Sequence, residues 1–245
     1  TNVGTVNSGE LPATGFPVLI SVTGDWLKTT TVDSTNGRIE DEGGDDIIFR
    51  ASDGRTQLYH EIEEYDGSAL TGGKLVAWVR VDSLSKGPED TTITMYYGND
   101  CVTSPTEDPA NVWDDNFKGV WHLKEDSDGT ADEFTDSSGN SNHGQGGAGT
   151  PDNVPTQTAS GKISYAQNYD GVNDQINCGS KSSLDNLPTM TVTAWIKPGV
   201  GETSRRLFEK RAASAESKNL YITTDPENRL RYVQKAEVGG TEMTR

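Results

Sequence analysis

The sequence predicts an all-β fold made of two tandem antiparallel β-sandwiches. Apolar and polar residues alternate in short runs such as TTITMYY, where Ile93, Met95 and Tyr97 share one face. Clusters of Gly, Asn, Asp and Pro separate these runs, and no run has the 3.6-residue period of an amphipathic helix. Short strands without helical crossovers form antiparallel sheets, which close as sandwiches or barrels.

The predicted strands follow one another along the chain with polar turns between them. The first half contains FPVLI, HEIEEYD, LVAWVRV and TTITMYY, and the second contains KGVWHL, TVTAWIK and RLRYVQK. Between the halves, SPTEDPANVWDDN carries Pro105 and Pro109, which cannot donate to a strand ladder. We therefore predict a first domain at residues 1–103, a linker at 104–117 and a second domain at 118–245.

Charge and composition exclude several classes of partner. A formal charge of −17 over 245 residues repels nucleic acid and anionic membrane surfaces. The one concentrated basic stretch, with Arg205, Arg206, Lys210 and Arg211, is too short to reverse this. No apolar run approaches the roughly 20 residues of a membrane span. The chain opens at Thr1 without a signal peptide, which indicates a processed or excerpted sequence.

The two cysteines leave two alternatives open. Cys101 and Cys178 form one disulfide in an oxidising compartment, or they stay as two isolated thiols. Their spacing does not decide between the two.

Several motifs resemble known families. FPVLISVTGDWLKTT, GDDIIFRASDGRTQLYHEIEEYD, LVAWVRVDSLS and TTITMYYGN resemble, in this order, a family of uncharacterised domains in large bacterial and archaeal surface proteins. NVWDDNFKGVWHLKE, DSSGNSNHG, YAQNYDGVNDQINCG and MTVTAWIKP resemble the concanavalin A-like jelly-roll sandwich of the laminin-G type. The resemblance implies two sandwiches in an extracellular, cell-surface protein. It implies no particular chemistry, because this fold hosts lectins, glucanases and structural modules.

Both resemblances have missing ends. Residues 1–15 hold no alternating run where the first family has an opening strand, and the second family continues beyond residue 245. Either the same polypeptide supplies the absent strands, which is the simpler alternative, or a neighbouring subunit does. In both cases an unpaired sheet edge invites a partner strand, so we expect residues 1–245 alone to be unstable or self-associating.

Acidic and histidine residues give no catalytic set. Glu61 and Glu63 share a face of the HEIEEYD strand, but alternation puts Tyr65, not a third acid, at the next place on that face. We interpret the pair as a solvated strand face. His60, His122 and His143 lie on separate elements without metal spacing. We therefore predict that the chain is not an enzyme.

The loop DSSGNSNHG is the strongest metal candidate. Asp136, Ser138, Asn140 and Asn142 offer hard oxygens at short spacing, and Gly139 permits a tight bend. The turn YDGVNDQ adds the similar side chains of Asp170, Asn173 and Asp174. One interpretation is a structural Ca²⁺, which many laminin-G-type domains carry. The slightly favoured alternative is a pair of turns in which Asx side chains bind their own backbone.

The tryptophans divide between packing and binding. In MTVTAWIK, Val192, Ala194 and Ile196 share one face, so Trp195 lies on the other, where it stacks on a sugar ring or packs under a loop. We assign Trp113 and Trp121 to a wedge between the domains. Trp26 and Trp78 are assigned to the first core.

Three functions remain for this combination of features. The first is a non-catalytic surface module for adhesion, with a glycan or another surface ligand as its partner. The second is a structural subunit of a filament, sheath or surface layer, with copies of itself as partners. The third, a glycan-active hydrolase or lyase, is disfavoured because no same-face acid triad is present.

Overall fold

The computed structural model describes residues 15–68, 70, 72–84, 90–185, 187, 189–199, 206–210, 219–224, 230–238 and 241–244. The chain divides into two compact units. The first comprises residues 1–169 and 173–189, and the second comprises residues 170–172 and 190–245. The part of the chain described here contains no helix that is both long and apolar enough to cross a membrane.

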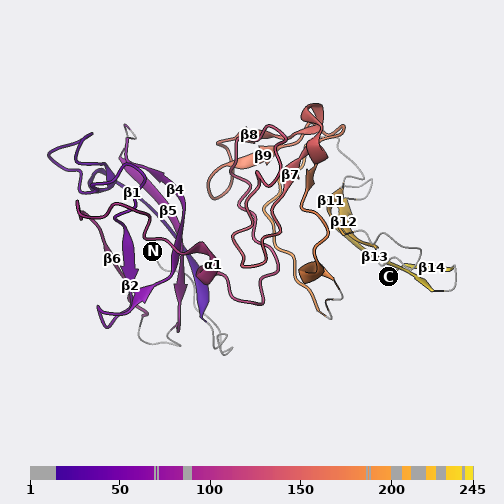
Figure 1. The fold of residues 1–245 in the computed structure, drawn as a ribbon, viewed down its shortest axis with the longest axis horizontal. Coiled ribbons are helices and arrows are strands. Elements are labelled where there is room, and N and C mark those ends of the chain that lie inside the picture. The colour runs from indigo at the N-terminus through magenta and orange to yellow at the C-terminus, as the bar shows by residue number, and fades with distance from the viewer. Residues whose placement is uncertain are drawn as a thin grey trace. The chain divides into compact units, whose positions relative to one another are not determined.

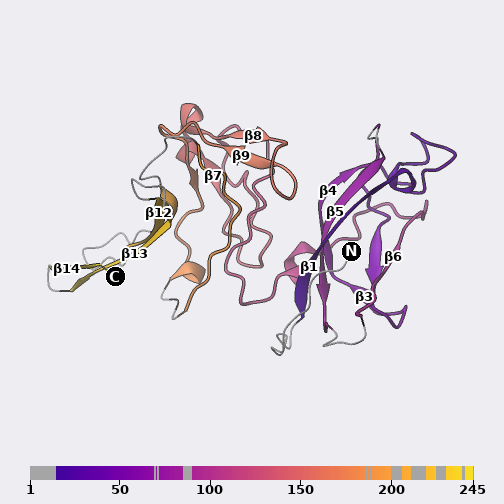
Figure 2. The same ribbon diagram turned by 180° about the vertical axis from the view of Figure 1, so that it is seen from behind.

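Two small antiparallel sheets form the core of the first unit. One has the order β1 (Phe16–Gly24), β5 (Gly73–Val81), β4 (His60–Asp66). The other has the order β3 (Gln57–Leu58), β2 (Ile48–Arg50), β6 (Thr94–Tyr96). Figures 1 and 2 show β2 and β6 on one side of the β1–β5–β4 sheet and the loops after α1 (Pro109–Val112) on the other. Both faces of the larger sheet are therefore covered.

Strand alternation places the core between the two sheets. Leu75, Ala77 and Val79 of β5 are fully buried and pack with Phe49 of β2 and with Leu58. The alternate residues of β5, including Trp78, face away from this core toward the loops. Trp26 packs partly buried against the core, as expected, whereas the assignment of Trp78 to it is wrong.

A β-bulge in β4 changes which side chains share its outer face. The register shifts between Ile62 and Glu64, so that Ile62 pairs with Ala77 and Glu64 pairs with Val76. The extra residue, Glu63, stays on the outer face with Glu61, and Glu64 joins them. Tyr65 turns to the core side, where it packs against the buried cluster. The prediction that Tyr65 follows Glu61 and Glu63 on one face is therefore wrong, because alternation is interrupted at the bulge.

The remainder of the first unit consists of short elements and turns. β7 (Gln145–Gly146) pairs with β10 (Ile176–Asn177), and β8 (Thr156–Thr158) pairs with β9 (Ala166–Asn168). Three-residue 3₁₀ turns occur at Asp25–Leu27, Gly147–Gly149, Pro151–Asn153 and Ser182–Leu184.

The second unit contains a four-stranded antiparallel meander. Its strands are β11 (Arg206–Lys210), β12 (Asn219–Thr224), β13 (Leu230–Val238) and β14 (Thr241–Thr244), paired in chain order.

The prediction of a mostly β chain with almost no helix is confirmed. The strands predicted at FPVLI, HEIEEYD, LVAWVRV, TTITMYY and RLRYVQK are present. Two predicted strands are not: KGVWHL contributes only the single bridge of Trp121 with Asp136, and residues 191–199 of TVTAWIKPG form no strand. The backbone of these segments is not paired in a ladder, so alternation alone does not make a strand.

Candidate functional site: a buried histidine–carboxylate cluster

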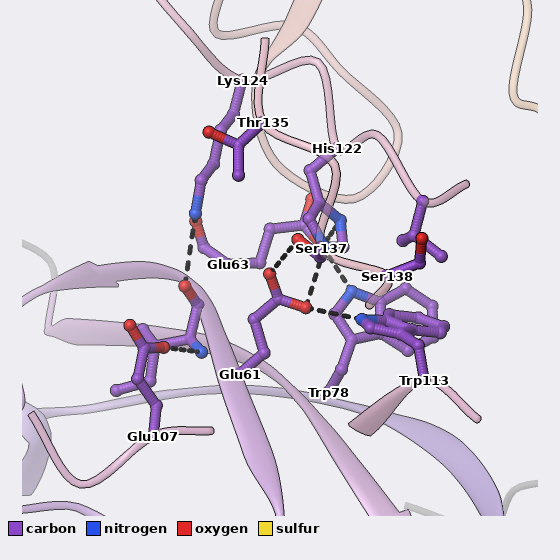
Figure 3. A network of polar contacts seen from close by, with 12 residues as sticks. Glu61, Glu63, Trp78, Glu107, Trp113, His122, Lys124, Thr135, Ser137 and Ser138 are labelled. Atoms are coloured by element: carbon purple, nitrogen blue, oxygen red, sulfur yellow. Dashed lines mark hydrogen bonds and ion pairs between the residues drawn. The ribbon is translucent and has the colours of Figure 1, made fainter. Parts of the chain in front are cut away.

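Glu61, Glu63 and His122 form a buried charged cluster on the outer face of β4. The imidazole lies between the two carboxylates: Nε2 is 3.1 Å from Glu61 Oε2 and Nδ1 is 3.2 Å from Glu63 Oε2. The Nε2 contact lacks hydrogen-bond alignment and is an electrostatic pair. Figure 3 shows the His122 side chain, which comes from a loop, beside Glu61 and Glu63 on the outer face of β4. The cluster thus joins β4 to a segment that follows it by about sixty residues of chain.

Neutral N–H and O–H groups also donate hydrogen bonds to both carboxylates. Trp113 Nε1 donates to Glu61 Oε2 at 2.8 Å, and the Ser137 hydroxyl donates to Glu61 Oε1 at 2.5 Å. Trp78 Nε1 donates to Glu63 Oε2 at 2.6 Å. The rings of Trp78 and Trp113 lie 5.3 Å apart and both flank the imidazole. Indole N–H groups suit this role because they donate to a carboxylate while their rings exclude water.

The cluster shifts the pKa values of His122 and Glu61 in opposite directions. Burial alone lowers the pKa of His122, but the close contacts and negative charges of Glu61 and Glu63 outweigh burial and raise that pKa to about 9. For Glu61, burial raises the pKa, and the contacts with His122, Ser137 and Trp113 outweigh it, so its pKa is lowered. His122 is therefore a cation at neutral pH, clamped between two anions.

Burial makes this arrangement unsuited to catalysis. The side chains of His122, Glu61 and Glu63 are only 8, 7 and 3% exposed. A general acid or base needs contact with a substrate, yet each polar atom here already faces another group of the protein. Glu64, the third acid on this face, pairs separately with Lys74 at 2.7 Å. The interpretation of Glu61 and Glu63 as a solvated face is wrong, because the loop carrying His122 covers them.

Further charged groups close the outer edge of β4. Lys124 Nζ donates to the carbonyl oxygens of Ile62 and Glu63, at 3.3 and 3.0 Å. Glu107 accepts from the Ile62 amide at 2.8 Å, and the Asp108 amide donates to the His60 carbonyl at 2.9 Å. These side chains and one backbone amide occupy positions that a neighbouring strand would use (Figure 3).

The loop DSSGNSNHG folds as a self-satisfied turn. Asp136 Oδ1 accepts from the amides of Val120 and Ser138, and Oδ2 accepts from the Ser138 hydroxyl and the Asn142 amide, at 2.7–2.9 Å. The Asn140 and Asn142 side-chain amides donate to the carbonyls of Phe117 and Lys118. Ser141 takes the left-handed conformation, with φ of 54°, whereas Gly139, at which the sequence permits a tight bend, has no positive φ.

These contacts do not fit a metal site. A cation at Asp136 would displace N–H and O–H donors that already use both carboxylate oxygens. In the other predicted turn, Asp170 Oδ1 accepts from the Val172 amide, and the Asn173 side-chain amide donates to Asn153. Across the described ranges, no group of three His, Cys, Asp or Glu side chains is placed to hold a metal ion. The functional part of the loop is Ser137, which reaches Glu61.

Of the two alternatives left open for the cysteines, the structure has the pair of isolated thiols. Cys101 and Cys178 are both free thiols. Cys101 is exposed in a turn, where its sulfur donates to the Asp100 carboxylate at 3.4 Å. Cys178 lies beside Gly144, and burial raises the pKa of its thiol to about 11. A thiol with such a pKa is an inert, apolar packing group at neutral pH.

Exposed aromatic side chains provide the remaining candidate surfaces. Trp195 is 71% exposed, but Val192 and Ile196 are exposed as well, so the predicted division of this segment into two faces is not seen. In the first unit, a groove of about 510 Å³ is lined by residues including Tyr59, Arg80, Asp82, Glu107 and Asp108. The Arg80 guanidinium lies 5.6 Å from the centre of the Tyr59 ring. Trp121 is engaged elsewhere, since its Nε1 donates to the Asn142 carbonyl.

Sequence reasoning missed the cluster because its members come from three distant segments. It assigned His122 to a plain strand, and it assigned Trp113 to a wedge between domains. One signal was available: two acids on a strand with buried neighbours, followed by a segment with three tryptophans or histidines within ten residues. Buried carboxylates need partners, and that segment is the nearest supply of N–H donors and positive charge.

Comparison with known proteins gives one family. Residues 43–142 match the family described as "Domain of unknown function (DUF2341)". The matched region contains Glu61, Glu63, Trp113, His122 and Ser137, so the whole cluster lies within this DUF2341 domain. It also extends past the linker predicted at residues 104–117. No curated protein matches the chain, and no solved structure matches it.

Proposed function

We propose that this chain is a non-catalytic, extracellular surface module that binds a glycan or another polar surface ligand. The observation that carries the proposal is the groove beside β3. It combines the half-exposed Tyr59 ring with the charged and hydrogen-bonding side chains of Arg80, Asp82 and Asp108, in a volume typical of small-ligand sites. An aromatic face with polar neighbours suits a sugar, which has both an apolar ring face and hydroxyl groups.

The buried cluster supports the non-catalytic part of the proposal. The acids best suited to glycoside chemistry, Glu61 and Glu63, are held by His122 and two tryptophans and are closed to substrate. Their role in the proposal is to fasten the loop of residues 118–138 onto the sheet.

A second part of the proposal concerns residues 118–245. We propose that they form a concanavalin A-like sandwich of the laminin-G type, with Trp195 as a second contact for ligand. The antiparallel pairs β7–β10 and β8–β9 and the meander β11–β14 are compatible with this. An experimental structure of the full chain with two stacked sheets in this region would establish it, and a single open sheet would exclude it.

A glycan array tests the proposal directly. The wild-type chain is expected to bind a defined set of glycans, and Tyr59→Ala is expected to lose about tenfold in affinity, because a stacked aromatic side chain contributes on the order of 1.5 kcal/mol. Tyr165→Ala, which changes another exposed tyrosine outside the groove (37% exposed, against 46% for Tyr59), is the control. Trp195→Ala separates the groove from the second region.

Two results would contradict the proposal. One is equal binding by the wild type and by Tyr59→Ala and Trp195→Ala. The other is hydrolysis or elimination of a polysaccharide that is lost in Glu61→Gln. Self-association into a dimer is a second candidate, favoured by one specific observation, the uncharged edge of β1.

A further inference from the structure

The β1 strand forms an uncharged edge of the larger sheet. Among the described residues its one strand neighbour is β5. FPVLISVTG contains no charged side chain, although charged residues make up 24% of the chain. Proteins commonly protect a long edge strand with charged residues, proline, a bulge or a covering segment. β1 carries only Pro17 as a protection of this kind, near its first residue.

The register shows which backbone groups β1 presents outward. The Arg80 amide donates to the Tyr59 carbonyl at 2.9 Å, so the backbone of Arg80 faces β4, and its partner in β1 is Pro17. In an antiparallel pair, two residues that lie opposite each other point their N–H and C=O groups either both toward the partner strand or both away from it. The backbone of Pro17 therefore points away from β5, and so does that of every second residue after it. The N–H and C=O groups of Leu19, Ser21 and Thr23 therefore point away from β5. The same alternation correctly places the Ile62 amide on the outer edge of β4, where Glu107 accepts from it.

The apolar core is also incompletely covered along β1. Val18, Ile20 and Val22 pack against the buried cluster but are only partly buried. Their partners across the pair, Val79, Ala77 and Leu75, are fully buried. The apolar side chains of the core face are thus less buried on β1 than on β5. This is typical of an edge strand whose apolar face has no further neighbour to cover it.

We propose that β1 is a self-association edge, at which the β1 strands of two copies pair antiparallel about a two-fold axis. The pairing is self-complementary, because each copy offers the same outward groups on Leu19, Ser21 and Thr23. The outward backbone groups belong to odd-numbered residues of β1. In any antiparallel register that bonds these groups, an odd-numbered residue of one copy therefore lies opposite an odd-numbered residue of the other. Val18, Ile20 and Val22 of both copies consequently lie on the same face and extend one apolar surface.

Charge selects a second copy at β1 rather than at β4. A chain with a net charge of −17 repels its own copies, and the outer edge of β4 is already occupied by Glu107, Lys124 and the Asp108 amide. β1 has no like charges to oppose. This inference goes beyond ligand binding by the groove, which does not depend on it.

Sedimentation velocity of the full chain over a range of concentrations tests the proposal. Ser21→Pro removes the Ser21 N–H and leaves the bonds to β5 intact, because that group points outward. Symmetry removes it twice per dimer, so the dissociation constant of the dimer is expected to rise at least about tenfold. Ser21→Thr, which keeps the N–H, is the matched control and is expected to dimerise like the wild type.

A second variant keeps the test valid if proline lowers stability. Ser21→Lys places a cation from each copy at the contact while leaving every backbone group in place, and it is expected to weaken the dimer similarly. Thermal melting of each variant at low concentration checks that the chain is folded. A wild type that stays monomeric at every concentration would overturn the proposal. A dimer that neither Ser21→Pro nor Ser21→Lys weakens would overturn it too.

Discussion

The two edges of the β1–β5–β4 sheet are built in opposite ways. β4 carries four acids and a bulge, and its outward backbone groups bind Glu107, Lys124 and the Asp108 amide. β1 carries no charge, and its outward groups have no strand partner among the described residues. One sheet thus has a closed edge and an open edge. The difference is that side chains and a backbone amide of the same chain occupy the outer edge of β4, whereas no described strand pairs with the outer edge of β1.

The outer face of the same strand, β4, carries a cation held between two anions. His122 and Lys124 together supply two positive charges, and Glu61 and Glu63 supply two negative charges. The balance explains why four ionisable groups are tolerated in a largely buried site.

Removing one charge from the cluster gives the largest effect. Glu61→Gln is expected to lower the free energy of unfolding by about 3–5 kcal/mol, because it leaves buried partners without their anion. Glu64→Gln makes the same substitution three residues away in a pair with Lys74 that is less buried, and it is expected to cost about 1 kcal/mol or less. Urea unfolding of both variants measures the difference. Equal losses in the two variants would show that the cluster contributes no special stability.

Alkaline pH is expected to weaken the cluster by deprotonating His122. The folded pKa of about 9 lies above the ordinary value of 6.5, so its contribution is complete below pH 6.5 and is lost as the pH rises to about 9. The loss is on the order of 3 kcal/mol. Glu61 has a lowered pKa, so its contribution is complete above its ordinary value of 4.5 and is lost in acid.

Stability measured by urea unfolding between pH 5.5 and pH 9.5 tests this, with His122→Gln as the control that should flatten the alkaline decline. NMR titration of the imidazole gives its pKa directly. A decline of the same size in the variant would assign the effect to other groups.

Loss of the lysine cap is expected to have a smaller effect. Lys124→Ala removes the ammonium from the carbonyls of Ile62 and Glu63 and should cost about 2 kcal/mol. Lys118→Ala removes a lysine that contacts only the exposed Asp115 carbonyl, and it should be close to neutral. Differential scanning calorimetry compares the two. If Lys118→Ala destabilises as much as Lys124→Ala, the cap has no particular role at the edge.

Calcium is expected to have no effect on stability. The Asp136 carboxylate already accepts from four N–H and O–H donors, so a native-state site for the ion is not available at this loop. Melting with calcium and with a chelator should give one midpoint. A higher midpoint with calcium that Asp136→Asn abolishes would restore the loop as a metal site.

Sequence patterns predicted the strands better than the site. Alternation identified β1, β5 and β6, since each has one face in a core. It failed at the β4 bulge, because one extra residue moves Tyr65 to the other face without any change in composition. It failed again at KGVWHL, where side-chain contacts of Trp121 and His122, not strand pairing, hold the segment. Pairings between distant segments were not readable from periodicity, which describes one segment at a time.

Amide hydrogen exchange of the full chain at low and high concentration tests the contrast between the edges most directly. The Ile62 amide, bonded to Glu107, is expected to be protected at both concentrations. The outward amides of Leu19, Ser21 and Thr23 are expected to exchange rapidly in dilute solution and to become protected as the concentration rises. Protection of these three amides independent of concentration, or rapid exchange at Ile62, would contradict the account of one closed and one open edge.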